Sequence, residues 1–209
     1  MDQMISKVSK FAPTNEFLLQ GSIMENAHDV LLHRLRGLCD NSDSPFETFT
    51  DNEMIFSMKN TTITQALNLR VRHSLIEQDS WQVRYAGMAE MGDKNRPTMV
   101  RHVIDCSTSD NIVLFLNELG FRMDHEFVIK GFYFHKGRMK VTVSKIYKMN
   151  QPGNTENLEP FSTSSLVELS VVTQQSGGEG IAEDMKSFSE QLKPLVQLEK
   201  VDHRRLQNI

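Results

Sequence analysis

A strong strand signal lies in residues 127–147. Two long runs rich in β-branched and aromatic residues flank Lys136 and Gly137. Glycine supplies the positive φ angle that a tight hairpin turn demands. The segment therefore predicts an antiparallel β-hairpin.

Three further segments alternate apolar and polar side chains with a period of two. They are residues 67–72, 81–85 and 99–106. Such alternation is typical of half-buried strands. Residues 16–24 and 166–172 also indicate strands. A long meandering sheet usually hides its edges by closing on itself, so we expect a closed or nearly closed antiparallel multistranded β-barrel.

Apolar residues at helical spacing predict three helices that flank this barrel, near residues 26–39, 109–120 and 181–193. The chain has 209 residues, of which 39% are hydrophobic, enough for one domain with a real core. We therefore predict a single α+β domain over residues 15–209. Residues 1–14 are polar and unpatterned, and we expect a flexible tail there.

Charge and cysteine content exclude several classes of protein. The net charge is −4, which argues against binding nucleic acid through its phosphates. No apolar run approaches the ~18 residues that a membrane span needs. Cys39 and Cys106 lie far apart without metal-ligand spacing, which fits a reducing compartment. The seven histidines show no zinc-site spacing, so we expect no metal or cofactor.

Residues 127–155 contain six lysines and arginines but no aspartate or glutamate. Such a stretch could form a basic surface for an acidic partner or phosphates. It could equally be a solvated face whose lysines protect a sheet edge. Both interpretations remain open at this point.

Cationic side chains also recur on the polar faces of the predicted strands: Arg70, Arg72, Arg84, Arg101, Arg138 and Lys140. Inside a barrel they could hold polyphosphate, and catalysis there would need carboxylates that bind Mg²⁺ or Mn²⁺. The acidic pairs at 51/53, 77/79 and 124/126 fall in predicted loops or at strand starts. Because charges are rarely buried unpaired, we expect these arginines on the outer surface. A metal-dependent triphosphate hydrolase with a basic tunnel is therefore the alternative function.

Several long strings together resemble one known family, the subunit 18 family of the Mediator coactivator of RNA polymerase II. They are residues 32–41 (LHRLRGLCDN), 91–96 (MGDKNR), 120–130 (GFRMDHEFVIK), 166–172 (LVELSVV) and 191–196 (QLKPLV). The resemblance implies a barrel similar to triphosphate-tunnel enzymes but without known activity. It therefore implies a non-catalytic scaffold of the Mediator head module, located in the nucleus.

The resemblance also implies partners. These are Mediator subunit 20, as a heterodimer of related barrels, and a helix from the C-terminal part of subunit 8. Other head-module subunits would connect the chain indirectly to RNA polymerase II. Aromatic residues often anchor interfaces, so we predict partner contacts at Phe132, Phe134 and Tyr147. The alternative, that all three rings belong to the core, stays open.

Overall fold

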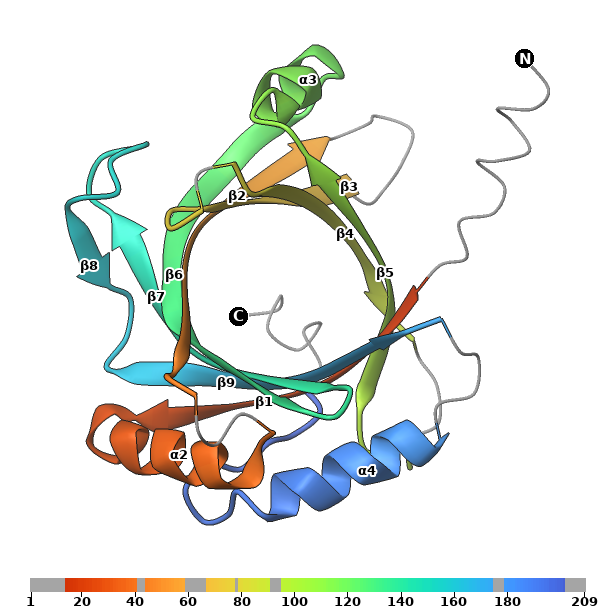
Figure 1. Cartoon of the computed structure of the whole chain (residues 1–209). Coiled ribbons are helices and arrows are strands. Elements are labelled where there is room, and N and C mark those ends of the chain that lie inside the picture. The colour runs from red at the N-terminus through yellow and green to blue at the C-terminus, as the bar shows by residue number, and fades with distance from the viewer. Residues whose placement is uncertain are drawn as a thin grey trace.

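A computed structural model of the chain describes residues 14–40, 44–58, 67–77, 79–90, 95–174 and 179–201 (Figure 1). Of the expected N-terminal tail, residues 1–13 lie outside this described part. Thr14 already belongs to the first strand.

The described residues form nine strands, and all their pairings are antiparallel. The strands are β1 (Thr14–Met24), β2 (Glu47–Met58), β3 (Leu67–Ser74), β4 (Trp81–Ala89), β5 (Met99–Thr108), β6 (Arg122–Lys136), β7 (Met139–Met149), β8 (Leu158–Pro160) and β9 (Ser164–Thr173). Their order is β6-β2-β3-β4-β5-β1-β9-β7-β8, and a further pairing of β6 with β7 closes the ring. Eight strands thus form a closed barrel, and β8 pairs with the C-terminal end of β7. The predicted α+β barrel is confirmed.

The β6–β7 hairpin closes this ring at the place that the sequence indicated. Lys136 pairs with Met139 next to the turn, and the φ angle of Gly137 is 55°. This angle lies in the left-handed region, where a side chain would be strained. A glycine at this position therefore allows the tight turn.

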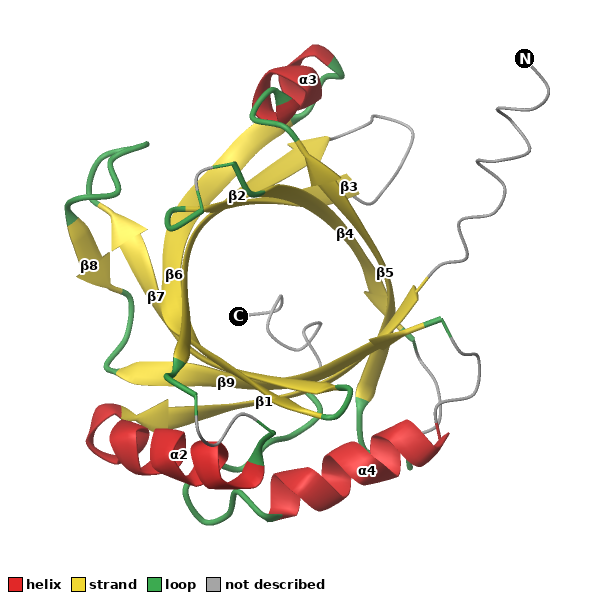
Figure 2. Cartoon of the chain, viewed as in Figure 1, coloured by secondary structure: helices red, strands yellow, loops and turns green. Residues whose placement is uncertain are grey.

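The described residues also form three helices, and these lie outside the barrel (Figure 2). α2 (Glu25–Leu38) and α4 (Glu179–Glu190) cover the side formed by β1 and β9, whereas α3 (Ile112–Glu118) packs against β2 and β3. The sequence placed them near 26–39, 181–193 and 109–120. No helix in the described residues is both long and apolar enough to cross a membrane.

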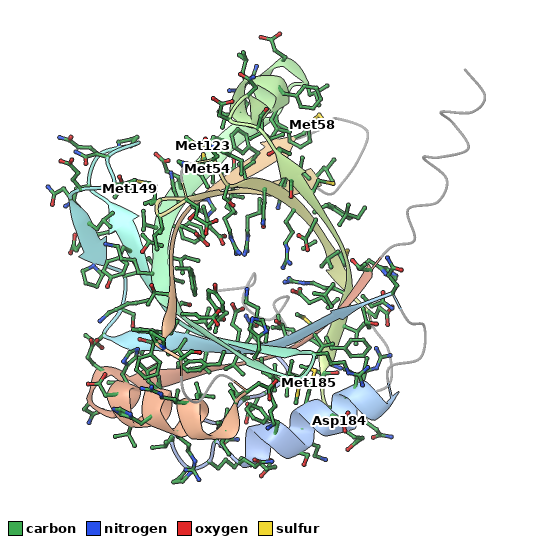
Figure 3. All side chains as sticks on the ribbon, viewed as in Figure 1. Met54, Met58, Met123, Met149, Asp184 and Met185 are labelled. Carbon is green, nitrogen blue, oxygen red and sulfur yellow. The ribbon has the colours of Figure 1, made fainter. Side chains whose placement is uncertain are left out.

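The main hydrophobic core lies between the outer face of the barrel and helices α2 and α4. The strands contribute Phe17, Leu19, Val141, Val143, Val167, Leu169 and Val171, and the helices contribute Leu31, Leu35, Ile181, Met185 and Phe188. Met185 lies between α4 and the barrel in Figure 3. Burying these side chains is the main driving force for this packing.

A second, smaller core lies beneath α3. Met54, Phe56 and Val71 from the barrel pack there against Ile112 and Leu116 of the helix. Successive side chains of a strand point to opposite faces. Because both cores take the outward-facing positions, the intervening polar residues face the barrel interior, called here the lumen.

The chain after α4 returns to the barrel and pairs with β1. The amide of Gln20 donates to the carbonyl of Glu199 at 2.9 Å, and the amide of Glu199 donates back at 2.8 Å. Gly21 permits this close approach, since a Cβ there would lie 2.4 Å from the carbonyl oxygen of Gln197. This segment thus fixes the C-terminal part of the described chain to the sheet.

Candidate functional site

The lumen wall carries many charged side chains beside apolar ones. In Figure 3 many nitrogen- and oxygen-bearing side chains project from the strands into the barrel. One end of the lumen forms a cavity of about 350 Å³, whose wall includes Asp51, Arg72, Lys140 and Glu168. These four residues come from β2, β3, β7 and β9, so the cavity belongs to the barrel interior. It is the candidate functional site.

Glu53 is the centre of one ion-pair cluster in the lumen. Its side chain lies on β2 and has no exposed surface (0%). Arg72 donates to Oε1 from Nε at 3.0 Å and from Nη2 at 2.5 Å. Arg70 Nε lies 3.2 Å from Oε2, and Arg72 Nε also lies 3.5 Å from Asp51 Oδ2. Two guanidinium groups therefore compensate the charge of this buried carboxylate.

Glu16 on β1 is the centre of a second cluster. Arg84 Nη1 donates to its Oε1 at 2.9 Å, and Arg101 Nε donates to its Oε2 at 2.7 Å. Arg84 also forms a two-point contact with Asp105, at 2.6 and 2.8 Å. Burial opposes the charge on Arg84, but the hydrogen bonds with Asp105 and the charge of Glu16 outweigh it and raise its pKa. This arrangement connects three neighbouring strands from the inside.

These clusters correct the prediction that the cationic side chains lie on the outer surface. Arg70, Arg72, Arg84, Arg101 and Lys140 face the lumen, and only Arg138 lies outside, where it pairs with Asp184 of α4 at 3.7 Å. The prediction was wrong because carboxylates on neighbouring strands neutralise the arginines. The helices meanwhile cover the apolar face on the outside.

The placement of one acidic pair is also corrected. Asp51 and Glu53 lie in the middle of β2 rather than in a loop, and both face the lumen. Between them Asn52 points outward, where its amide donates to Glu126 at 3.4 Å. Polar residues on both faces removed the alternation that reveals a strand. The lumen therefore does carry a strand-borne acidic pair, but arginines already occupy its carboxylates.

The pKa values of Lys140 and Asp51 are shifted in the cavity. Burial raises the pKa of Asp51, against the opposing effect of Arg72. Burial and the like charges of Arg72 and Arg84 lower the pKa of Lys140. Among the described residues, no group of three or more histidine, cysteine, aspartate or glutamate side chains is placed to hold a metal ion.

On the outer surface, the three predicted partner-binding aromatics differ in exposure. Phe134 is buried in the main core, and its ring meets Phe46 edge-on at 5.9 Å. Phe132 and Tyr147 are half-buried on the outer face of the β6–β7 hairpin. Both line a groove of about 270 Å³. Phe134 is thus a core residue, as the alternative interpretation allowed. Partner binding stays a prediction for Phe132 and Tyr147.

The basic stretch at 127–155 does not form one continuous basic surface. Four of its cations meet carboxylates of other segments: Lys136 with Asp40, Arg138 with Asp184, Lys145 with Glu25 and Lys148 with Glu159. Of the remaining two, Lys130 lies over the ring of Tyr147 and Lys140 faces the lumen. These lysines do not protect a sheet edge, because β6 and β7 each pair with strands on both sides in the closed barrel. Most of them lie in local ion pairs instead.

The sequence did not single out an apolar surface on α3 as a partner site. Leu114, Phe115 and Leu119 are each more than half exposed, while Ile112 and Leu116 face the core. The helix is apolar all round, and that pattern was the available signal. Clustered exposed apolar side chains are typical of interaction sites.

The fold is a closed antiparallel barrel of the type also seen in a viral triphosphatase. The Mimivirus capping enzyme triphosphatase matches with a TM-score of 0.54 at 7% identity, covering 91% of this chain and 94% of that chain. A chain in the structure of the Schizosaccharomyces pombe Mediator head module matches with a TM-score of 0.72 at 15% identity, covering 90% and 98%. Identities this low show a shared fold only.

Sequence comparison defines the family. The sequence model of the Med18 protein family matches residues 15–208. Mediator of RNA polymerase II transcription subunit 18 from Aedes aegypti is 51% identical over 198 residues, covering 94% of this chain and 89% of that protein. The Danio rerio protein of the same name is 51% identical over 192 residues, covering 91% and 90%. The chain belongs to the Mediator subunit 18 family, as the motifs predicted.

Proposed function

We propose that the chain is a non-catalytic scaffold subunit of the Mediator head module that supports RNA polymerase II transcription in the nucleus. Membership of the Mediator subunit 18 family is the observation that carries this proposal. The scaffold would hold partner subunits on its outer surface, while the lumen stabilises the barrel.

The lumen geometry supports a structural rather than a catalytic role. Hydrolysis of a triphosphate would need free carboxylates for the metal and free cations for the phosphates. In this barrel Glu53 is paired with Arg70 and Arg72, and Glu16 is paired with Arg84 and Arg101. A substrate would have to separate these buried ion pairs, at a cost that its own contacts must offset.

The outer surface offers what a scaffold needs. The exposed apolar side chains of α3, together with Phe161, which is 74% exposed, are typical of surfaces that a partner covers. The half-buried rings of Phe132 and Tyr147 border a groove that also contains Lys130 and Lys145. Aromatic anchors in a groove suit the apolar face of a docked helix.

We assign two partners to these surfaces from the family resemblance. Mediator subunit 20, a related barrel, would form the heterodimer, and a helix from the C-terminal part of subunit 8 would occupy a groove. Contact with RNA polymerase II would then run through other head-module subunits. No direct sequence-specific contact with nucleic acid is part of this proposal.

A melting experiment on the full chain distinguishes the scaffold from the hydrolase. Any ligand of the native state raises the melting temperature in a concentration-dependent way. We expect millimolar ATP with Mn²⁺ to leave Tm unchanged, while co-expressed subunit 20 and the subunit 8 segment raise it. Two results together would contradict the proposal. ATP with Mn²⁺ would raise Tm in the parent chain but not in Arg72→Ala, and the parent chain would release phosphate from ATP.

A further inference from the structure

Lys140 differs from the other cations of the lumen. Each lumen arginine lies within 3.2 Å of a carboxylate oxygen. In the described part of the chain, no carboxylate lies within 4 Å of Lys140 Nζ; its contact is the ring of Tyr133, whose centroid is 5.1 Å away. Lys140 is an exposed residue, and it lines the cavity. It is therefore available to an anion.

The charges around Lys140 also favour an added anion. Burial lowers the pKa of Lys140, and the positive charges of Arg72 and Arg84 lower it further. Asp51 and Glu168 act on it with the opposite sign, but their effect does not outweigh that of burial and the two arginines. An anion beside Lys140 would relieve its repulsion from Arg72 and Arg84.

The wall of the cavity supplies hydrogen-bonding groups around this point. Ser74, Ser80, Gln82, Thr142 and Ser144 line it along with the two cations. Hydroxyl and amide groups of this kind donate to anionic oxygens. The volume of about 350 Å³ suits a small molecule.

The same wall limits the charge of the ligand. Asp51, Glu77 and Glu168 also line the cavity. A polyphosphate would meet these carboxylates with the same sign, while the arginines that could oppose it are held by Glu53 and Glu16. The charge of one phosphate or carboxylate group can be balanced by Lys140. A hydrogen-bond donor on the same ligand can donate to the carboxylate of Glu168 or Glu77.

From this geometry we propose that the cavity at this end of the lumen binds a small ligand with a single phosphate or carboxylate group. Lys140 holds that group, and a hydrogen-bond donor of the same ligand faces the acidic wall. This site is independent of the scaffold role. The outer surface can hold partners whether or not the lumen is occupied.

The test uses the full chain and four probes: O-phospho-L-serine, inorganic phosphate, tripolyphosphate, and a heptapeptide with one central phosphoserine. We expect phosphoserine to raise Tm in a saturable way and to bind more tightly than tripolyphosphate. If phosphoserine binds and the peptide does not, the ligand is a free small molecule. If the peptide binds as well, a phosphorylated side chain of a partner also fits the cavity. Either result supports the site.

Lys140→Met removes the cation and should weaken phosphoserine binding roughly tenfold or more. Lys148→Met is the matched control, since Lys148 lies on the same strand but is more than half exposed and pairs with Glu159 on the surface. If Lys140→Met does not fold, the binding site is instead located in the parent chain from the amide chemical shifts that phosphoserine changes. Changes confined to Ser74, Gln82 and Thr142 support the site. An absence of binding by every probe, unchanged binding in Lys140→Met, tighter binding of tripolyphosphate, or shifts confined to the outer surface would overturn it.

Discussion

Arg72 donates from both Nε and Nη2 to a single carboxylate oxygen of Glu53 inside the barrel. Glu53 has no exposed surface, so the pair fixes β2 to β3 from the lumen side. A buried carboxylate of this kind is tolerated only while its cations stay in place. The barrel thus depends on internal ion pairs as well as on its two hydrophobic cores.

Glu53→Gln should destabilise the fold by about 3 kcal/mol, because it leaves Arg70 and Arg72 facing the lumen without that charge. Urea unfolding with a fixed m-value measures the change. Glu159→Gln is the matched control, since Glu159 pairs with Lys148 on the surface and both are more than half exposed. Its cost should stay below about 1 kcal/mol. Equal costs for the two variants would contradict a stabilising role of the lumen pairs.

Phe134→Ala should lower stability by about 3–5 kcal/mol, because it empties a position in the main core. Phe132→Ala should cost less, since its ring is only half-buried, but it should reduce recovery of partner subunits. Thermal unfolding and co-purification measure the two effects on the same samples. Normal partner recovery with Phe132→Ala and Tyr147→Ala together would remove the hairpin groove as an interface.

Asp51→Asn should gain stability relative to the parent chain as the pH rises from about 4 to about 7. Burial raises the pKa of Asp51, so the folded chain binds this proton more tightly than the unfolded chain. The parent therefore loses stability as the pH rises through that raised pKa, whereas the neutral amide does not. Urea unfolding at both pH values measures the difference. A growing advantage of the parent at the higher pH would show that the pairing with Arg72 outweighs burial.

Cys39 should resist alkylation in the folded chain, whereas Cys106 should react. Burial raises the pKa of Cys39 to about 11, and its side chain is 8% exposed. Cys106 is exposed. Since the thiolate is the reactive form, iodoacetamide at about pH 8 should add one label before unfolding and a second one afterwards. Mass spectrometry counts the labels, and rapid double labelling of the native chain would contradict the buried placement.

Gly21→Ala should detach the C-terminal segment from β1, because the new Cβ would meet the carbonyl oxygen of Gln197. The hydrogen bonds between Gln20 and Glu199 would then lengthen or break. Amide hydrogen exchange at these two residues should speed up, with little change in β7. Gly137→Ala is a contrasting variant, since its strain would act at the β6–β7 turn. Unchanged exchange at Glu199 in Gly21→Ala would contradict the close packing.

Much of the fold could be predicted from the sequence because strand alternation and helix spacing are local. Residues 67–72 alternate clearly, and Gly137 indicates the hairpin turn. Alternation shows that two faces differ, but it does not show which face becomes the inside of a barrel. That choice depends on where α2, α3 and α4 pack, which is a property of the whole chain.

The candidate site was harder to predict for the same reason. Arg72 and Glu53 are 19 positions apart, and Arg84 and Glu16 are 68 positions apart. Their pairing follows from the register of the closed sheet, which no local pattern encodes. Phe132 and Phe134 share one face of β6. Both rings contact Phe46, yet only Phe134 is buried, a difference that depends on the packing of the whole core.

A scaffold subunit of Mediator holds its partner subunits in a stable, stoichiometric assembly. The most direct measurement is a mild affinity purification of the tagged full chain from nuclear extract, with quantitative mass spectrometry of the proteins that co-elute. We predict stoichiometric recovery of a second barrel subunit, Mediator subunit 20, together with other head components. Recovery of the chain alone, soluble and monodisperse, would show that it does not act as a Mediator scaffold.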